Sequence, residues 1–211
     1  MNQLQRNFSL CAIAAILAGC STLGGGAGNT ASSTAAPAAS SKVETKKITV
    51  IQEWTFADGD TQGWRMGWSS SEETAITDMD VEAPLGLKLT LNYEAKGWGD
   101  SNLKLAWTEP QAPAALSMRI LIPAELGKPK GPLQVGCAMN EPWSEAKHWP
   151  DLKMAEHVTI NKKEYLAQNV TCRLGSSSAQ HKALILRFGG ERVRFKGNVY
   201  IQNIRALSSL D

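Results

Sequence analysis

Residues 87–93 read Leu-Lys-Leu-Thr-Leu-Asn-Tyr, with an apolar side chain at every second position. Side chains of a β-strand point alternately to its two faces, so this pattern predicts a strand with one buried and one solvent-facing side. The same period of two recurs in residues 103–107, 116–122, 133–139 and 184–188. These repeated short strands predict an all-β fold.

Turn-forming residues separate these segments. They include Asp58-Gly59, the stretch Gly97–Asp100 and the stretch Lys196–Asn198. One short stretch, Asp151–Glu156 after Pro150, is compatible with a helix. Many short strands joined by turns are typical of a β-sandwich or jelly roll.

The N-terminus has the layout of a targeting segment. Arg6 precedes an apolar run from Phe8 to Leu17, which ends in Leu-Ala-Gly-Cys at Cys20. A positive start, a short apolar middle and small residues predict a signal peptide over residues 1–19. The run is shorter than the ~20 residues that a membrane-spanning helix needs.

The four residues that end at Cys20 resemble the lipobox of bacterial lipoproteins. In that family the cysteine sulfur takes a diacylglyceryl group and the chain is cut before it. The resemblance implies an exported chain held on the membrane by its lipid anchor. Because Ser21 follows where Asp would favour the inner membrane, we expect the outer membrane, on its periplasmic or cell-surface side. The alternative is an ordinary secretory signal with an incidental cysteine.

Composition divides the rest of the chain into a linker and one domain. Residues 20–46 hold the lipidated cysteine and a stretch dominated by Ser, Thr, Gly, Ala and Pro, which has little to bury and predicts a disordered tether. Residues 47–211 are long enough for one domain with a real core. The formal net charge of the chain is only +2, and no basic cluster is interleaved with aromatics, which argues against nucleic acid as a partner.

Cysteine usage predicts one disulfide. Of the four cysteines, Cys11 leaves with the signal peptide and Cys20 is committed to lipid. Exported compartments are oxidising, so the remaining pair, Cys137 and Cys172, is expected to form a disulfide. Two buried free thiols are the alternative.

Motifs of catalysis are scarce. There is no G-x-S-x-G elbow or glycine-rich phosphate loop, and the three histidines lack metal-site spacing. Three acidic residues near one another, Glu141, Glu145 and Asp151, contain the best candidate pair for a glycosidase, which needs two carboxylates across a cleft. Acidic residues are common in loops, so we expect no enzyme and no cofactor, with a small glycan hydrolase or lyase as an alternative. Turn carboxylates such as Asp58 and Asp60 are expected to cap backbone amides more often than to bind Ca²⁺.

Tryptophan is the most informative residue type, with seven against three Tyr and four Phe. Trp54 and Trp107 lie within strand patterns and are expected in the core. A tryptophan in a polar loop exposes a large apolar ring, which is costly unless the ring packs on the domain or meets a ligand. Indole rings stack on the apolar C–H face of a pyranose, so we expect at least two of the tryptophans beside turns to form a sugar platform. These are Trp64, Trp68, Trp98, Trp143 and Trp149.

Several stretches resemble known carbohydrate-binding domains. Residues 54–64 resemble the opening strand and turn of galactose-binding-like jelly rolls, and residues 197–204 resemble their terminal strand. Residues 97–105, 117–123 and 138–143 resemble mannan-binding carbohydrate-binding modules of β-mannanases. Together these stretches cover most of residues 52–205 in the right order.

The resemblance implies a monomeric jelly-roll β-sandwich that binds β-1,4-mannan along a tryptophan-lined surface without catalysis. It implies Trp64, Trp98 and Trp143 as stacking rings. Candidate partners of sugar hydroxyls are Asn140, Glu141 and Arg187, the last on the non-core face of its strand by alternation.

This sequence departs from that family in two ways. The carboxylates that often hold a structural Ca²⁺ in these jelly rolls are replaced by Ala57 and Gln202, which places that calcium in doubt. No catalytic domain is attached, so the domain would act by capture or display. The alternative to glycan binding is a structural or envelope-assembly lipoprotein that uses the sandwich for protein contacts.

Overall fold

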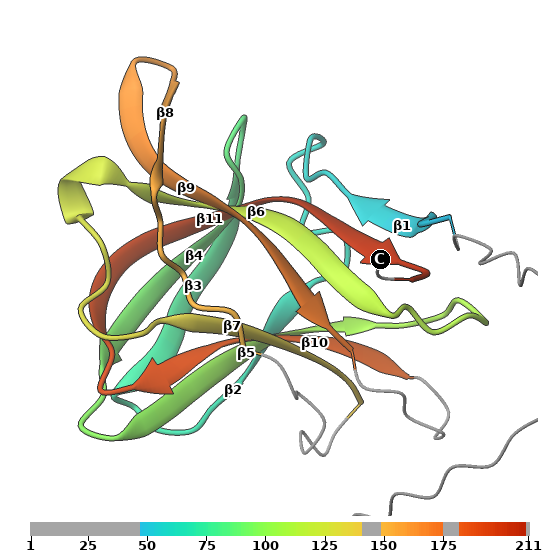
Figure 1. Cartoon of the computed structure of the whole chain (residues 1–211), viewed down its shortest axis with the longest axis horizontal. Helices are drawn as coiled ribbons and strands as arrows, with labels where there is room; N and C mark the ends of the chain where they lie inside the picture. Colours follow the sequence, from blue (N-terminus) through green and yellow to red (C-terminus); the bar gives the residue numbers. More distant parts are fainter. Residues whose placement is uncertain (1–46, 141–148, 175–181, 210–211) are drawn as a thin grey trace, which may run out of the picture. The chain divides into compact units, whose positions relative to one another are not determined.

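The computed structural model describes residues 47–140, 149–174 and 182–209, all of which belong to one compact unit, Glu44–Asp211. Their strands form two antiparallel sheets, as the alternating sequence patterns predict (Figure 1). In chain order the elements are β1 (Val50–Trp54), β2 (Arg65–Ser69), β3 (Thr74–Glu82), β4 (Gly86–Glu94), β5 (Trp98–Ala106), β6 (Ala115–Pro123), the short 3₁₀ helix η1 (Ala124–Leu126), β7 (Gln134–Met139), β8 (Glu156–Ile160), β9 (Lys163–Arg173), β10 (Ala183–Glu191) and β11 (Arg194–Leu207).

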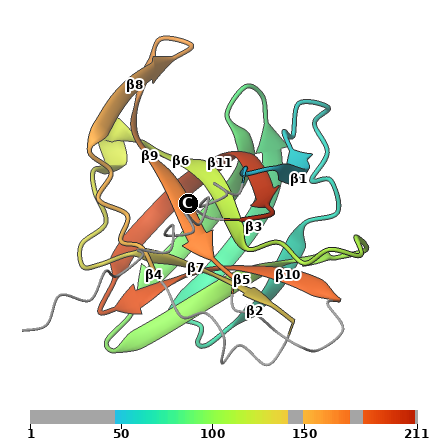
Figure 2. The same ribbon diagram turned by 45° about the vertical axis from the view of Figure 1, so that its right-hand side comes forward.

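The two sheets lie one upon the other as a β-sandwich. The larger, seven-stranded sheet has the order β3-β4-β11-β6-β9-β8, with β1 paired to the last part of β11. The smaller has the order β2-β5-β10-β7 and forms the lower layer in Figure 2. The expected all-β sandwich is therefore confirmed.

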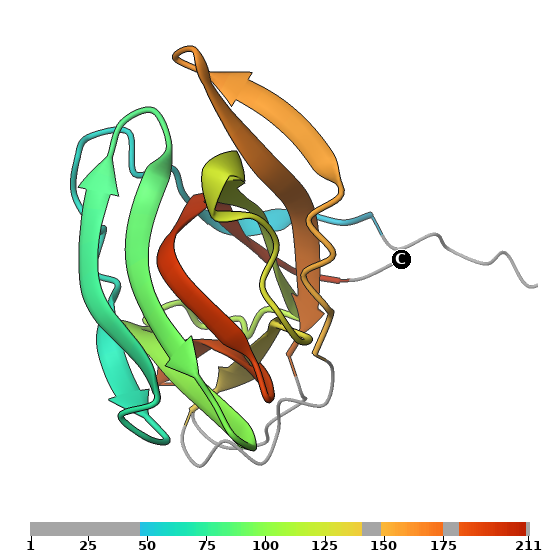
Figure 3. The same ribbon diagram turned by 90° about the vertical axis from the view of Figure 1, so that its left-hand side faces the viewer.

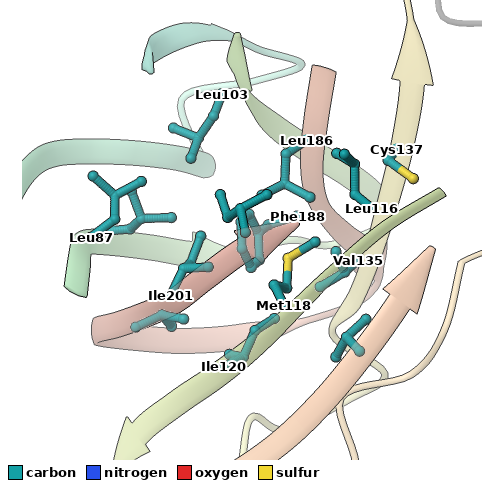
Figure 4. Packing of buried hydrophobic residues seen from close by; sticks show 14 of the residues in the cluster. Leu87, Leu103, Leu116, Met118, Ile120, Val135, Cys137, Leu186, Phe188 and Ile201 are labelled. Atoms are coloured by element: carbon teal, nitrogen blue, oxygen red, sulfur yellow. The ribbon is translucent and has the colours of Figure 1, made fainter. Parts of the chain in front are cut away.

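Apolar side chains of both sheets fill the space between them. Leu87, Leu89 and Leu91 of β4 are fully buried, whereas the alternate residues of the same strand are only half-buried. Figure 4 shows Leu103 of β5 and Phe188 of β10 directed toward side chains of the larger sheet. Burial of each such side chain stabilises the fold by about 1.5–3 kcal/mol relative to solvent exposure.

Two further links join the sheets. The Tyr93 hydroxyl of β4 donates to the carbonyl of Phe188 in β10 at 2.8 Å and is also hydrogen-bonded to the Ser101 hydroxyl of β5. Burial raises the pKa of this phenol far above its ordinary value, so it stays protonated. The expected disulfide between Cys137 of β7 and Cys172 of β9 is confirmed, with the two Cα atoms 5.8 Å apart.

Two local predictions are wrong. Residues Asp151–Glu156 form no helix: Asp151 makes an isolated bridge to Gln134, and β8 begins at Glu156. Lys196–Asn198 form no turn because they lie inside β11, where Gly197 is paired with Leu91. A glycine within a strand can mark a close contact instead of a turn, and here a side chain at Gly197 would collide with Leu126, 2.5 Å from its position.

Candidate functional site: the outer face of the smaller sheet

Three tryptophans lie on the face of the four-stranded sheet that points away from the core. Strand β5 explains why this face is available. Leu103 and Leu105 point into the sandwich, so Trp98, Asp100 and Asn102 point outward by alternation. The turn predicted over Gly97–Asp100 is wrong, because β5 already begins at Trp98.

Trp98 and Trp149 form an edge-to-face pair on this surface. Their ring centroids are 5.4 Å apart and the planes are inclined by 87°. Trp98 is 52% exposed, the most exposed of the large hydrophobic side chains among the described residues, and Trp149 is half-buried. An exposed indole in such a pair offers a rigid apolar surface whose N–H can also donate.

A glycine gives Trp149 its place on the sheet. Gly136 is an outward-facing position of β7, between Val135 and Cys137, which both point into the core. A Cβ atom at Gly136 would lie 2.8–2.9 Å from three atoms of the Trp149 ring. The absence of a side chain therefore lets the indole lie directly on the strand.

The third tryptophan, Trp68 of β2, covers a buried ion pair. The Arg187 guanidinium carbon is 5.2 Å from the Trp68 ring centroid, within the range of a cation–π contact. Arg187 Nη1 is 3.4 Å from Asp100 Oδ2, and the two side chains are 3% and 6% exposed. Because Arg187 is paired with both Asn102 of β5 and Gly136 of β7, this ion pair lies in the middle of the sheet, between the tryptophans.

Burial dominates the electrostatics of this ion pair. It raises the pKa of the Asp100 carboxyl above its ordinary value, although the Arg187 charge and a hydrogen bond with Ser70 both lower it. The cost of desolvating the carboxylate therefore outweighs the attraction of the guanidinium.

Asn102 is a polar side chain of the same face that lacks a protein partner. It is 1% exposed, and neither its amide nitrogen nor its amide oxygen has a hydrogen-bond partner among the described residues. It lies beneath Gly67, where an added Cβ would be 1.8 Å from the Asn102 amide oxygen. A buried amide without partners costs free energy, so this side chain calls for a specific explanation.

The sequence-predicted site residues differ in where the structure places them. Trp98 is on the surface as expected. Trp64 as a stacking ring is wrong: it is 1% exposed and packs edge-on against Trp54 in the core, with centroids 5.5 Å apart. The turn before it is closed by a hydrogen bond from the Trp64 amide to the Thr61 carbonyl, and the Trp64 ring lies in the core. Glu141 and Trp143 lie outside the described residues, as does Glu145 of the hydrolase alternative.

The two remaining candidates have structural contacts. The Asn140 side-chain oxygen accepts the backbone N–H groups of Lys182 at 2.6 Å and Ala183 at 3.1 Å, which ties the end of β7 to the start of β10. Arg187 is on the non-core face, as alternation predicts, but it is buried beneath Trp68 and therefore supports this ring from below.

The described residues contain no cluster of three or more His, Cys, Asp or Glu side chains suited to a metal ion. The carboxylates of the first turn cap backbone amides, as expected: Asp58 accepts the N–H of Asp60, and Asp60 accepts the N–H of Gln62. Gln202 donates its side-chain amide to the Pro84 carbonyl. In the part of the chain that the structure describes, no helix has the length and apolar character required to cross a membrane.

The chain matches no family model and no curated protein. Solved structures nevertheless share its fold. The carbohydrate-binding module TmCBM27, described for specific mannan recognition, is 19% identical with a TM-score of 0.65, covering 78% of this chain and 99% of the module.

Two other modules are similar. CBM27-1 of Caldicellulosiruptor saccharolyticus, solved with mannohexaose, is 20% identical with a TM-score of 0.53 and covers 76% of this chain and 96% of its own. A CBM28 module specific for non-crystalline cellulose is 16% identical with a TM-score of 0.50 and covers 74% of this chain and 93% of its own. At these identities the similarity shows a shared β-sandwich fold.

Proposed function

We propose that this protein is a non-catalytic glycan-binding protein whose ligand is a β-1,4-linked polysaccharide of the β-mannan class. The observation that carries the proposal is the Trp98–Trp149 pair, which leaves an indole half in solvent on a sheet face where it contributes little to the core. Large exposed apolar groups on a folded domain mark binding surfaces. The structural neighbours that bind mannan and cellulose support a β-glycan as the ligand.

In this proposal each of the three tryptophans contacts a different part of the ligand. Trp98, the exposed ring, stacks on one pyranose ring, and Trp149, which is perpendicular to it, contacts the edge of that sugar. Trp68 stacks on a further ring at the other side of the sheet. The Arg187–Asp100 ion pair holds the Trp68 ring from below. Asn102, whose amide has no partner among the described residues, could pair with a sugar hydroxyl if Gly67 shifts.

Binding without hydrolysis fits the carboxylates that lie near these rings. Asp100 is ion-paired and buried, and Asp151 accepts a hydrogen bond from the Gln134 side-chain amide at 2.7 Å. A glycosidase needs one carboxylic acid and one carboxylate facing each other across the scissile bond. Release of reducing sugar by the purified protein, abolished by Glu141→Gln, would favour the hydrolase alternative.

Affinity electrophoresis in galactomannan and glucomannan tests the proposal. Wild-type protein should migrate more slowly in these gels than in gels without polysaccharide. Trp98→Ala and Trp149→Ala should each weaken binding by about 2 kcal/mol or more, the cost of truncating an aromatic hot spot. Val50→Ala, which truncates another exposed apolar residue on β1, is the control and should bind as wild type. Equal migration of the wild type with and without several β-glycans contradicts the proposal.

The proposal includes display from a membrane. Acylation at Cys20 and the tether over residues 20–46 would hold the domain at the outer membrane while leaving it free to reach polysaccharide. Labelling cells with a radioactive fatty acid should mark the wild-type protein, and Cys20→Ser should abolish the label. If the wild-type protein takes up no label and is found in the soluble fraction, the proposed lipid anchor is contradicted. Glycan binding is then tested by affinity electrophoresis alone.

A further inference from the structure

A basic pocket lies at the edge of the larger sheet, apart from the tryptophans. It has a volume of about 240 Å³ and opens between the segment that follows η1 and the first part of β11. Figure 3 shows this segment running beside β11. The backbones of Lys130 and Arg194 are joined there by two hydrogen bonds of 3.0 and 2.8 Å. The pocket therefore has two walls fixed to each other by backbone contacts.

Four cations line the pocket against one carboxylate. Lys128 and Lys130 come from one wall and Arg194 and Lys196 from the other, while Glu94 is the acidic residue. All four cationic residues are exposed, and none of them takes part in an ion pair among the described residues. Like charges gathered in a concave site repel one another and raise the local concentration of anions. The pocket thus presents unneutralised positive charge to a small anionic group.

The pocket is connected to the tryptophan face by short stretches of backbone. Glu94 ends β4 and Trp98 begins β5, so one short connection has the pocket at one end and the exposed indole at the other. Within it, Ala95 donates to the Val193 carbonyl at 3.0 Å, and the Gly97 carbonyl accepts the Arg192 N–H at 2.8 Å. Glu94 of the pocket and the exposed Trp98 are therefore joined by residues 95–97 alone, and backbone hydrogen bonds hold this connection in place.

We propose that this pocket binds an anionic substituent, carboxylate or phosphate, carried by a polysaccharide that also contacts the tryptophan face. The inference rests on the proposed glycan-binding function and extends its ligand class from neutral to acidic β-glycans. Lysine and arginine recognise both groups through charge-assisted hydrogen bonds, and the planar guanidinium of Arg194 suits a two-oxygen contact.

The test compares two oligosaccharides with the same backbone. A β-1,4-linked mannuronate oligomer differs from a β-1,4-linked manno-oligosaccharide by a carboxylate on each ring. Titration calorimetry of the wild-type protein at low salt should show tighter binding of the mannuronate oligomer. The double variant Lys128→Gln/Lys196→Gln removes one cation from each wall and should weaken mannuronate binding by about tenfold or more, since each lost contact is charge-assisted. The affinity for the neutral oligomer should not change.

The matched control removes two exposed lysines at the tip of the β8–β9 hairpin, Lys162→Gln/Lys163→Gln. It has the same net charge as the pocket variant and should retain mannuronate binding. An equal loss in both double variants shows a general charge effect and overturns the inference, as does equal wild-type affinity for the two oligomers. Inorganic phosphate that occupies the pocket as tightly as the oligomer also overturns it, because the site is then one for free anions.

These outcomes are separable from failure of the proposed function. Loss of neutral-oligomer binding in Trp98→Ala, with the pocket variant unaffected, supports the tryptophan face alone. If the wild type binds only the mannuronate oligomer and the pocket variant loses it, the pocket stands and the neutral β-mannan proposal fails.

Discussion

The outer faces of the two sheets carry aromatic pairs of nearly the same geometry with opposite exposure. Trp98 and Trp149 on the smaller sheet meet at 5.4 Å and 87°, and Tyr165 and Tyr200 on the larger sheet meet at 6.0 Å and 86°. The tyrosines are only 4% and 5% exposed, whereas Trp98 is 52% exposed. Edge-to-face contact alone therefore does not distinguish a packing pair from a binding pair; access to solvent does.

Neighbouring strands explain the difference. The tyrosines belong to a second apolar cluster with Leu85 and Leu121, and the β8 residues Val158 and Ile160 pack against that cluster. The β8–β9 hairpin, which extends beyond the rest of its sheet in Figures 1 and 3, supplies these β8 residues. The smaller sheet has no comparable cover over Trp98 among the described residues. The tyrosine face is thus a structural surface and the tryptophan face an accessible one.

The largest expected effect comes from the ion pair beneath Trp68. Arg187→Met leaves Asp100 buried without its cation, and removal of one partner of a buried pair destabilises by about 3–5 kcal/mol. Denaturant unfolding measures this loss. Glycan binding should fall with it even at temperatures where the variant is folded, because Trp68 loses its support. Full stability in the variant would show that this pair does not stabilise the fold, and unchanged glycan binding would show that the tryptophan face does not depend on it.

Tyr200→Ala tests the tyrosine pair on the larger sheet. Truncation of a buried aromatic residue should lower the free energy of unfolding by about 3 kcal/mol. Glycan affinity should be unchanged, since the tyrosine pair is on the opposite sheet. Tyr200→Phe removes only the hydroxyl, which is 3.3 Å from Glu82, and is the milder control. Loss of glycan binding in a folded Tyr200→Ala protein would place a ligand on the larger sheet.

Gly136→Ala tests whether the sheet surface positions the indole pair. The added methyl group would lie 2.8 Å from the Trp149 ring, so the ring must move away from the strand. We expect glycan binding to weaken by about 1 kcal/mol, within the range for overpacking of a fitted contact. Gly97→Ala is the matched control, because a Cβ there meets nothing within 4 Å although it adjoins Trp98. Equal glycan binding by both variants would mean that the affinity does not depend on the position of the Trp149 ring on the strand.

Much of the fold follows from period-two patterns. They identify β4, β6, β7 and β10 and the core positions of Trp54 and Trp107, because one buried face imposes strict alternation. Strand β9 is less evident, since its residues Tyr165, Leu166 and Ala167 are all buried and break the alternation. A strand covered on both faces has no polar side to signal it.

The site is harder to predict because exposure is a tertiary property. Trp64 and Trp98 both adjoin glycines, yet one packs inside and the other lies in solvent. Trp149 and Trp68 both adjoin turn residues in the sequence. Only the folded structure shows that Trp149 lies over Gly136 and Trp68 over Arg187. The usable sequence signal was Gly136 itself, an outward glycine in a strand, which marks a close approach by another group.

The smallest expected effect is a pH dependence of stability between acid and neutral pH, which comes from Asp100 on the tryptophan face. Because burial raises the Asp100 pKa, the folded state binds this proton more tightly than the unfolded state. The free energy of unfolding therefore contains a contribution that is fully present below the unfolded pKa of about 3.9 and is lost as the pH rises through the raised folded value. This contribution amounts to about 1.4 kcal/mol for each unit of pKa difference.

Asp100→Asn isolates this contribution. As the pH rises from the ordinary titration range of an aspartate to neutrality, the wild type should lose stability relative to the variant. The substitution also leaves Arg187 without a carboxylate, but this cost does not depend on pH and does not affect the slope. Glu82→Gln, next to the buried tyrosines, provides the comparison on the larger sheet and tests whether the slope belongs to Asp100. A pH-independent difference for Asp100→Asn would mean that Arg187 holds the carboxyl near its ordinary pKa, and the ion pair beneath Trp68 would then be better solvated than its burial indicates.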